Sequence, residues 1–177
     1  GISITRNSNN ASTPTLDFGK SRGNSVGSNV IVQEDDQLGV IQFCGSDGTD
    51  IETEAAQIVG QVDGTPGSND MPGRLVFKTT PDGSSTAVER LRISANGKIL
   101  IGSGTIRNIG GASALGHFQF EGTTGNTSSV SLINNQNNAN GVAVLRFAKT
   151  RATSDGGVTT VVDGDSLGSI TFTGADG

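Results

Sequence analysis

The chain has 177 residues, of which 27 are glycine, and a formal net charge of −5. Hydrophobic residues make up 32% of it, against roughly 45–50% in a typical soluble domain, and Trp and Tyr are absent. The mild acidity disfavours nucleic acid and anionic membranes as partners, because both attract surfaces rich in Lys and Arg. No segment approaches the roughly 18 consecutive apolar residues of a membrane-spanning helix, so we expect no membrane insertion.

This composition predicts a thin core rather than a disordered chain. Only 16% of the residues are charged, whereas disordered chains usually combine low hydrophobicity with high charge. A chain so poor in large apolar residues either buries them against copies of itself or is only marginally stable alone. The single cysteine, Cys44, cannot form an intrachain disulfide, so stability must come from packing and assembly. The start, Gly1 to Ile4, is neither an initiator methionine nor a signal peptide, so we expect a piece of a longer protein.

An internal repeat of 129 residues organises the sequence. Leu16–Gly48 matches Leu145–Gly177 without a gap, and 15 of the 33 positions are identical. The matches include Leu, Phe, Lys, Arg, Val and Ile, so glycine content alone does not explain them. We therefore expect a first repeat unit over residues 1–129 and the incomplete start of a second unit over 130–177. Within the first unit, we expect a β module over about 14–105 and a connector over about 106–129.

The pattern within a unit is typical of β-strands. Apolar residues alternate with polar ones or gather in β-branched runs that suit a pleated sheet. We expect strands at Leu16–Phe18, Val30–Val32, Val40–Phe43, Gln57–Val62, Arg74–Thr79, Glu89–Ser94, Lys98–Ile101, Phe118–Phe120, Val130–Ile133, Val158–Val162 and Ser169–Thr173.

The segment from Arg74 to Gly102 predicts a three-stranded meander. Pro81-Asp82-Gly83 marks its first turn, and Asn96-Gly97 is the preferred pair for a type I′ hairpin turn. Ile51–Gln57 is the only fair helix candidate, and it is short and lacks caps. The stretch 106–140 is rich in Gly, Asn and Ser and is interpreted as a connector. The expected fold class is all-β, with repeated antiparallel modules joined by Gly/Asn-rich connectors.

Few residues suggest catalysis. His117, the only histidine, would have to serve any Ser–His–Asp triad or His-bearing zinc site, and a structural or surface role suits it better. Cys44 stands where the second copy has Thr173, so we interpret it as a packing position rather than a catalytic thiol.

Clustered carboxylates are the more tempting group, since they could bind calcium or form the acid pair of a glycosidase. The clusters are Glu34-Asp35-Asp36 and Asp47 to Asp50, with Asp163, Asp165 and Asp176 in the second copy. Asp36 and Asp47 thus recur, whereas Asp35 becomes Gly164. Turn chemistry explains these residues better, because Asp before Gly is common in turns.

Two basic residues also recur: Lys20 and Arg22 match Lys149 and Arg151. They either pair with acidic residues of a neighbouring chain or form a solvated face. We expect no catalytic, cofactor-binding or metal-binding residues, and no enzymatic activity.

Three phrases carry a resemblance to a known family: GKSRGNSVGS, SNDMPGRLVFKTTPDGSS and ERLRISANGKILIG. They resemble repeats of tail-fibre and other structural proteins of marine and cyanobacterial bacteriophages, where similar stretches often precede a self-cleaving chaperone domain. The resemblance covers nearly all of the chain and implies a segment of a homotrimeric fibre shaft that carries a receptor-binding tip. It implies copies of the chain and other fibre or virion proteins as partners, indirect contact with a host receptor, and a virion location. It transfers no active site.

Two other functions remain open from the sequence. An extracellular or cell-surface filament or adhesin subunit would also need β modules that associate. A glycan-binding module or tailspike-type depolymerase is disfavoured by the absence of Trp and Tyr, on which sugars commonly stack.

Overall fold

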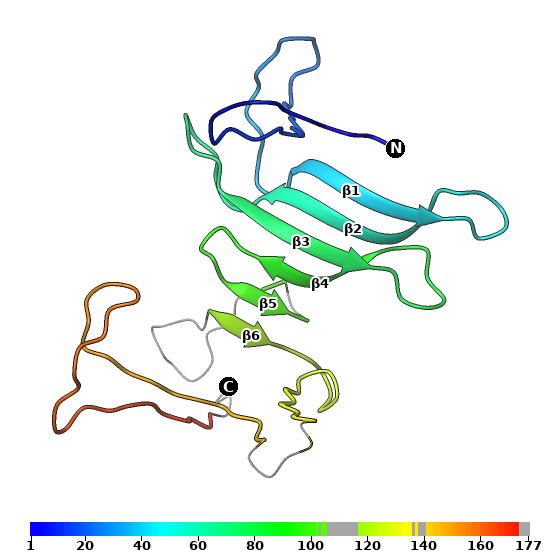
Figure 1. The fold of residues 1–177 in the computed structure, drawn as a ribbon. Helices are drawn as coiled ribbons and strands as arrows, with labels where there is room; N and C mark the ends of the chain where they lie inside the picture. The colour runs from blue at the N-terminus through cyan, green and yellow to red at the C-terminus, as the bar shows by residue number, and fades with distance from the viewer. Residues whose placement is uncertain (103, 106–116, 136, 138–140, 174–177) are drawn as a thin grey trace. The chain divides into compact units, whose positions relative to one another are not determined.

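The computed structural model describes residues 1–102, 104–105, 117–135, 137 and 141–173. These residues form an all-β structure with one six-stranded sheet (Figure 1). The strands are β1 (Gln37–Gly45), β2 (Thr53–Val62), β3 (Gly73–Thr79), β4 (Val88–Ile93), β5 (Ile99–Ile101) and β6 (Phe118–Phe120). No helix in this part of the chain is long and apolar enough to cross a membrane.

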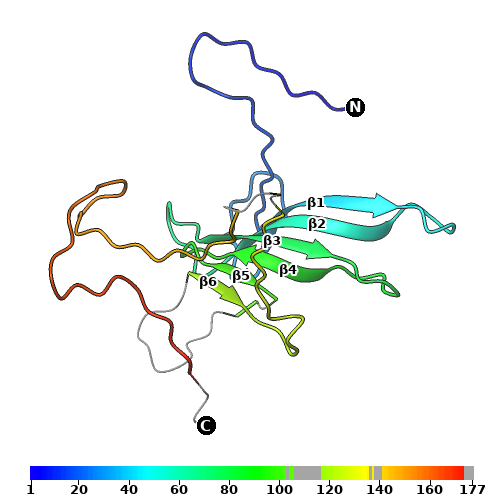
Figure 2. The same cartoon turned by 60° about the horizontal axis from the view of Figure 1, so that its bottom comes forward.

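The sheet is a meander with one parallel strand added at its edge. Its order is β1-β2-β3-β4-β5-β6, so every strand lies beside its neighbours in sequence, as Figures 1 and 2 show. The first five strands pair antiparallel, which confirms the meander predicted after Arg74. β6 pairs parallel to β5, with Ile99 opposite Phe118 and Ile101 opposite Phe120. A segment interpreted as connector thus supplies a strand of the sheet.

The helix alternative for Ile51–Gln57 is wrong, because β2 begins at Thr53. This strand pairs with β1 on one side and β3 on the other, so Gln57 faces Gln42 and Lys78. Two ladders of backbone hydrogen bonds outweigh the weak helical propensity of this uncapped segment.

The turn between β4 and β5 is also not the predicted type I′ turn, which needs positive φ at both central residues. Only Gly97 has positive φ, at 75°. The Gly97 N–H donates to the Ser94 carbonyl at 2.9 Å, and the Ser94 N–H donates to the Lys98 carbonyl at 3.0 Å. This is the three-residue loop in which a type I turn is followed by a left-handed glycine.

Several expected strands do not form. The structure describes these segments, but none of them is a strand of the sheet: Leu16–Phe18, Val30–Val32, Val130–Ile133, Val158–Val162 and Ser169–Thr173. A strand needs a neighbour for its backbone groups, and alternation alone does not supply one. Ser169–Thr173 matches Val40–Cys44 of β1, but the positions equivalent to β2 lie beyond Gly177.

The core is thin, as the composition predicted. Its buried apolar side chains in the described structure are Val32, Val59, Val62, Val76 and Leu100. Val59, Val76 and Leu100 come from β2, β3 and β5, so the most buried residues sit in the inner strands.

The chain divides into two compact units. The first contains residues 1–106 and 115–128, including all six strands, and the second contains 107–114 and 129–177. The division into repeat units at residue 129 stays a prediction, and residues 106–116 of the expected connector lie outside the described residues.

Candidate functional site

One face of the sheet is apolar from edge to edge. Strand register places one row of side chains across all six strands: Ile41, Ile58, Phe77, Leu91, Ile101 and Phe120. Because side chains alternate along a strand, residues two positions away lie on the same face. Among these are Phe43, Leu75, Ile93, Ile99 and Phe118, and the eleven large apolar residues together are called the apolar face. Glu89, two positions before Leu91, belongs to the opposite face because a register irregularity pairs it with Lys78.

Much of this face is exposed in the single chain. Phe118 is 58% exposed, Phe43 53% and Ile41 45%, and the other members are exposed or half-buried. In the described sheet, no charged residue pairs with a member of the apolar face. The exposed Arg90, at the register irregularity between β3 and β4, lies at its margin and donates to the Thr79 hydroxyl at 3.0 Å. The apolar face is thus a large surface without charge at its paired positions, and much of it remains exposed.

The opposite face carries the charges. Its central row contains the buried Val59, Val76 and Leu100, and Arg92 lies between the last two. The Arg92 guanidinium donates to both carboxylate oxygens of Glu89, at 2.6 and 2.7 Å. The pair neutralises its own charges beside the buried residues, which reduces the cost of placing them there.

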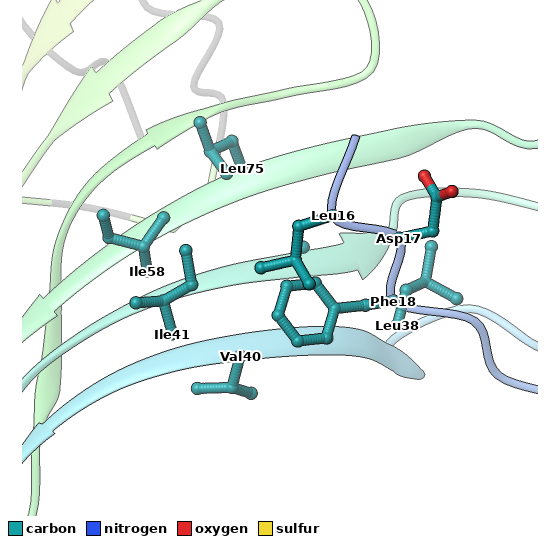
Figure 3. A pocket seen from close by; sticks show the side chains of 10 residues that line it. Leu16, Asp17, Phe18, Leu38, Val40, Ile41, Ile58 and Leu75 are labelled. Atoms are coloured by element: carbon teal, nitrogen blue, oxygen red, sulfur yellow. The ribbon is translucent and has the colours of Figure 1, made fainter. Parts of the chain in front are cut away.

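A shallow pocket lies at the β1–β2 end of the apolar face (Figure 3). Its volume is about 280 Å³, and Leu16 and Phe18 lie over it on the same side as Ile41, Ile58 and Leu75. Phe18 packs on Gly39, where a Cβ atom would lie only 2.7 Å from Phe18 Cγ. Leu16 and Phe18, predicted as a strand, therefore cover the part of the sheet where Gly39 has no side chain.

The same packing recurs in the second copy of the sequence. A Cβ atom on Gly168 would lie 2.6 Å from the Cβ of Phe147. A pocket of about 300 Å³ is lined there by Phe147, Leu167, Gly168, Ser169 and Ile170. Each of these follows its counterpart in the first pocket by 129 positions.

A second recurring contact is the ion pair of the loop before β1. Arg22 donates from Nε and Nη2 to the two carboxylate oxygens of Asp36, at 2.6 and 2.8 Å. The Gln33 N–H donates to the same carboxylate at 3.0 Å, and the Arg22 N–H donates to the Val30 carbonyl at 3.1 Å. We call this loop, residues 22–36, the Arg–Asp turn.

Every one of these contacts is found again at residues 151–165. Arg151 donates to both oxygens of Asp165 at 2.8 and 3.1 Å, and the Val162 N–H donates to Asp165 at 2.9 Å. Lys149 adds a contact to Asp165 at 3.2 Å. The recurring Arg residues therefore pair with acidic residues of their own chain, and their side chains remain exposed, as on a solvated face. Pairing with a neighbouring chain stays a prediction.

These ion pairs shift the pKa values of the carboxylates. The Arg22 hydrogen bonds, followed by the Gln33 N–H, hold the pKa of Asp36 far below its ordinary value. The Arg151 hydrogen bonds, followed by the Val162 N–H, lower the pKa of Asp165 to about 2. Both side chains are thus ionised near neutral pH, and the hydrogen bonds of the turn keep them ionised at lower pH than an ordinary aspartate.

A third charge cluster attaches the Arg–Asp turn to the sheet. Arg74 in β3 pairs with Asp35 and donates to Asp63 at 2.9 Å. Burial opposes the ionisation of Asp63, but the Ala95 N–H and Arg74 outweigh it, and the pKa of Asp63 is lowered. Asp35 has a φ of 69°, and its counterpart Gly164 has 84°, so the Asp-to-Gly change keeps a left-handed position.

The acidic clusters hold turns, as predicted. Asp47 accepts from the Thr49 N–H at 2.8 Å and from the Thr53 hydroxyl at 2.9 Å, and Gly48 has a φ of 94°. Among the residues that the structure describes, no group of three or more His, Cys, Asp or Glu side chains is placed to hold a metal ion. Asp176, the counterpart of Asp47, lies outside the described residues.

The two other residues that were considered for catalysis, Cys44 and His117, lie at the surface. Cys44 is exposed at the end of β1. His117 is exposed just before β6, and its carbonyl accepts from the Ile99 N–H at 2.8 Å. Residue-by-residue reading missed the apolar face, although the alternation in the predicted strands already contained its signal.

No known protein family matches the sequence, and no curated protein is similar to it. Two of the solved structures to which the chain is similar come from bacteriophage T5. One is the carboxy-terminal domain of the L-shaped tail fibre, with a TM-score of 0.46 and 18% identity over 57% of this chain and 36% of that chain. The other is this domain with its intramolecular chaperone domain, with a TM-score of 0.46 and 22% identity over 57% of this chain and 24% of that chain. The chain thus spans only about a third or less of these tail-fibre chains.

Proposed function

We propose that the chain is a non-catalytic structural segment of a bacteriophage tail fibre or a similar virion appendage. In this proposal, three copies lie side by side along a shaft that carries a receptor-binding tip. The observation that carries it is the recurrence of one packed turn 129 residues along the chain, each time beside exposed apolar residues.

Recurring modules of this kind suit a mechanical role. Repeats that each contact mainly their neighbours build length, and their stability comes from intrinsic terms plus contacts between units. The first copy adds a sheet, yet besides Pro66 only five apolar side chains of the described residues are buried. A segment with so small a core gains stability if it associates, as a shaft of several chains does.

The proposed partners follow from this role. They are other copies of the chain and other proteins of the fibre or virion, and a host receptor is reached only through the tip. The sequence phrases that resemble phage fibre repeats favour a virion over a cellular filament.

Immunogold labelling tests the proposal directly. Antibodies raised against this chain are applied to cells and particles from a culture that carries its gene. We expect label along appendages of virus particles. Label on cell-surface filaments, in cultures without particles, would replace the virion proposal with the extracellular filament.

A further inference from the structure

We infer that the apolar face is the surface through which copies of this chain associate. Each copy presents the face formed by Ile41, Ile58, Phe77 and their neighbours to another copy. The inference rests on the proposed function only for the number of copies, three.

The size of the exposed surface supports an interface. At about 200 Å² for the full surface of a large side chain, the exposed fractions of Ile41, Phe43, Leu75, Ile93, Phe118 and Phe120 leave roughly 540 Å² open. The half-buried residues of the apolar face add to this. The largest apolar patch of a typical monomer is about 300–600 Å², and a standard interface covers about 800 Å² per partner. The apolar face therefore lies at or above the upper limit for monomers.

The distribution of charge selects a copy of the chain as the partner. Where three copies surround a common axis, the side chains nearest the axis meet their own counterparts, so a charge there would face its own like charge. The apolar face has none at its paired positions, whereas Arg74, Lys78, Glu89 and Arg92 belong to the opposite face. A patch with an apolar interior can pack against its copies while the charges at its margin, Asp17 and Arg90, stay exposed to solvent.

The repeat supplies an independent reason. Phe147, Ile170 and Phe172 hold the positions of Phe18, Ile41 and Phe43 in the second copy, and they are 51%, 68% and 92% exposed. A partner that covers the same positions in successive units must itself repeat every 129 residues. A parallel copy of this chain has that spacing by construction.

The mass in solution tests the inference. We compare the unchanged chain, Ile41→Glu with Leu75→Glu, and Gln42→Glu by light scattering after size exclusion. Gln42 is the matched control, because it is exposed on the same strand but lies on the opposite face. We expect three chains for the unchanged protein and Gln42→Glu, and a folded single chain of 17.9 kDa for the double variant. A single-chain mass for the unchanged protein, or an unaltered mass of the double variant, would overturn the inference.

Thiol protection keeps the test decisive if the double variant does not fold. Ile41→Cys and Gln42→Cys are each made in a Cys44→Ser background, so that each chain has one thiol. We expect maleimide to react several-fold more slowly at position 41 than at 42, and Leu75→Glu to remove this difference. Equal reactivity at 41 and 42 would mean that the face is open. Protection at 41 in a protein of single-chain mass would mean that the chain covers its own face, and it would also overturn the inference.

These outcomes are separate from those of the labelling experiment. A mass of two chains with protected position 41 would support the interface and contradict the proposed trimer. Label away from virus particles would contradict the proposed function and leave the interface intact.

Discussion

Gly39 and Phe18 show how one missing side chain shapes the surface of this protein. The Phe18 ring and its Cβ occupy the space that a Cβ atom on Gly39 would need. Phe147 and Gly168 repeat this contact in the second copy. The glycine serves close packing here rather than an unusual backbone angle, since its φ is not in the left-handed region.

Replacing Gly39 with alanine should therefore destabilise the fold. We expect a loss of about 1–3 kcal/mol in the free energy of unfolding, the usual cost of overpacking. Gly60→Ala is the matched control, because Gly60 pairs directly with Gly39 and has no atom within 4 Å of its added Cβ. Urea unfolding at equal protein concentrations measures both. Equal effects of the two substitutions would show that Phe18 does not pack on Gly39.

The acid sensitivity of the Arg–Asp turn is a second prediction for single residues. The pKa of Asp36 is lowered mainly by Arg22, and that of Asp165 is lowered to about 2 mainly by Arg151. A folded-state pKa below the unfolded value means that the ionised group stabilises the fold. This stabilisation is complete above the unfolded pKa of about 4 and disappears as the pH falls through the folded pKa.

Asp165→Asn should thus lower the melting temperature near neutral pH and make little difference at a pH of about 2. Asp36→Asn should likewise lose its effect as the pH falls through the lowered pKa of Asp36. Thermal melts followed by circular dichroism at a series of pH values test this. Asp82→Asn is the control, an exposed aspartate of the β3–β4 turn. A stability difference that does not change with pH would rule out the ion pairs as its cause.

At the scale of elements, the sequence predicted the sheet strands well where both neighbours follow in sequence. Arg74–Thr79 is a strand as expected, and Gln57–Val62 is the second half of β2. Phe118–Phe120 is also a strand as expected, although it lies at the edge with a single neighbour. Alternation and turn residues are local signals, so a meander of adjacent strands is the topology that they describe best.

The same signals were misleading where pairing depends on distant residues. Val30–Val32 and Val158–Val162 are β-branched runs, yet both lie in the loops of the Arg–Asp turns. The turns depend on ion pairs across 14 residues, and no periodicity reveals such a contact. The parallel pairing of β6 was equally hidden, because parallel neighbours need a long connection.

The hairpin between β4 and β5 gives a prediction for an element. Gly97 has a φ of 75° and no atom within 4 Å of an added Cβ, so alanine there meets conformational strain alone. We expect Gly97→Ala to cost about 1–2 kcal/mol and Gly97→Asn clearly less, because Asn tolerates the left-handed region. Gly45→Ala is the control, since Gly45 is equally open and has no positive φ. Equal effects of Gly97→Ala and Gly45→Ala in urea unfolding would contradict the assigned turn.

For the whole molecule, comparing the two copies of the repeat distinguishes contacts that the local sequence determines from contacts that need the sheet. The Arg–Asp turn and the aromatic residue packed on glycine form in both copies. Among the described residues, the sheet forms only in the first copy, where β1 has β2 as its neighbour. The turn contacts thus depend on local sequence, whereas a strand forms only where a neighbouring strand can pair with it.

Hydrogen exchange tests this division along the chain. Peptides from β2 and β3 should exchange slowest, because each strand has neighbours on both sides. Peptides over residues 37–45 should be intermediate, since β1 is an edge strand. Residues 166–173 match β1 in sequence but have no strand partner in the described chain, so they should exchange fastest.

Mass spectrometry of overlapping peptides gives these rates, with the fully unfolded chain as the reference for complete exchange. Protection of residues 166–173 equal to that of 37–45 would contradict the prediction. It would mean that this segment pairs as a strand in solution, with a partner that the single chain does not provide. The two segments share Leu, Gly, Ile and Phe at four of eight matched positions, so each is compared with its own unfolded reference, and the remaining difference in exchange reports the neighbouring strand.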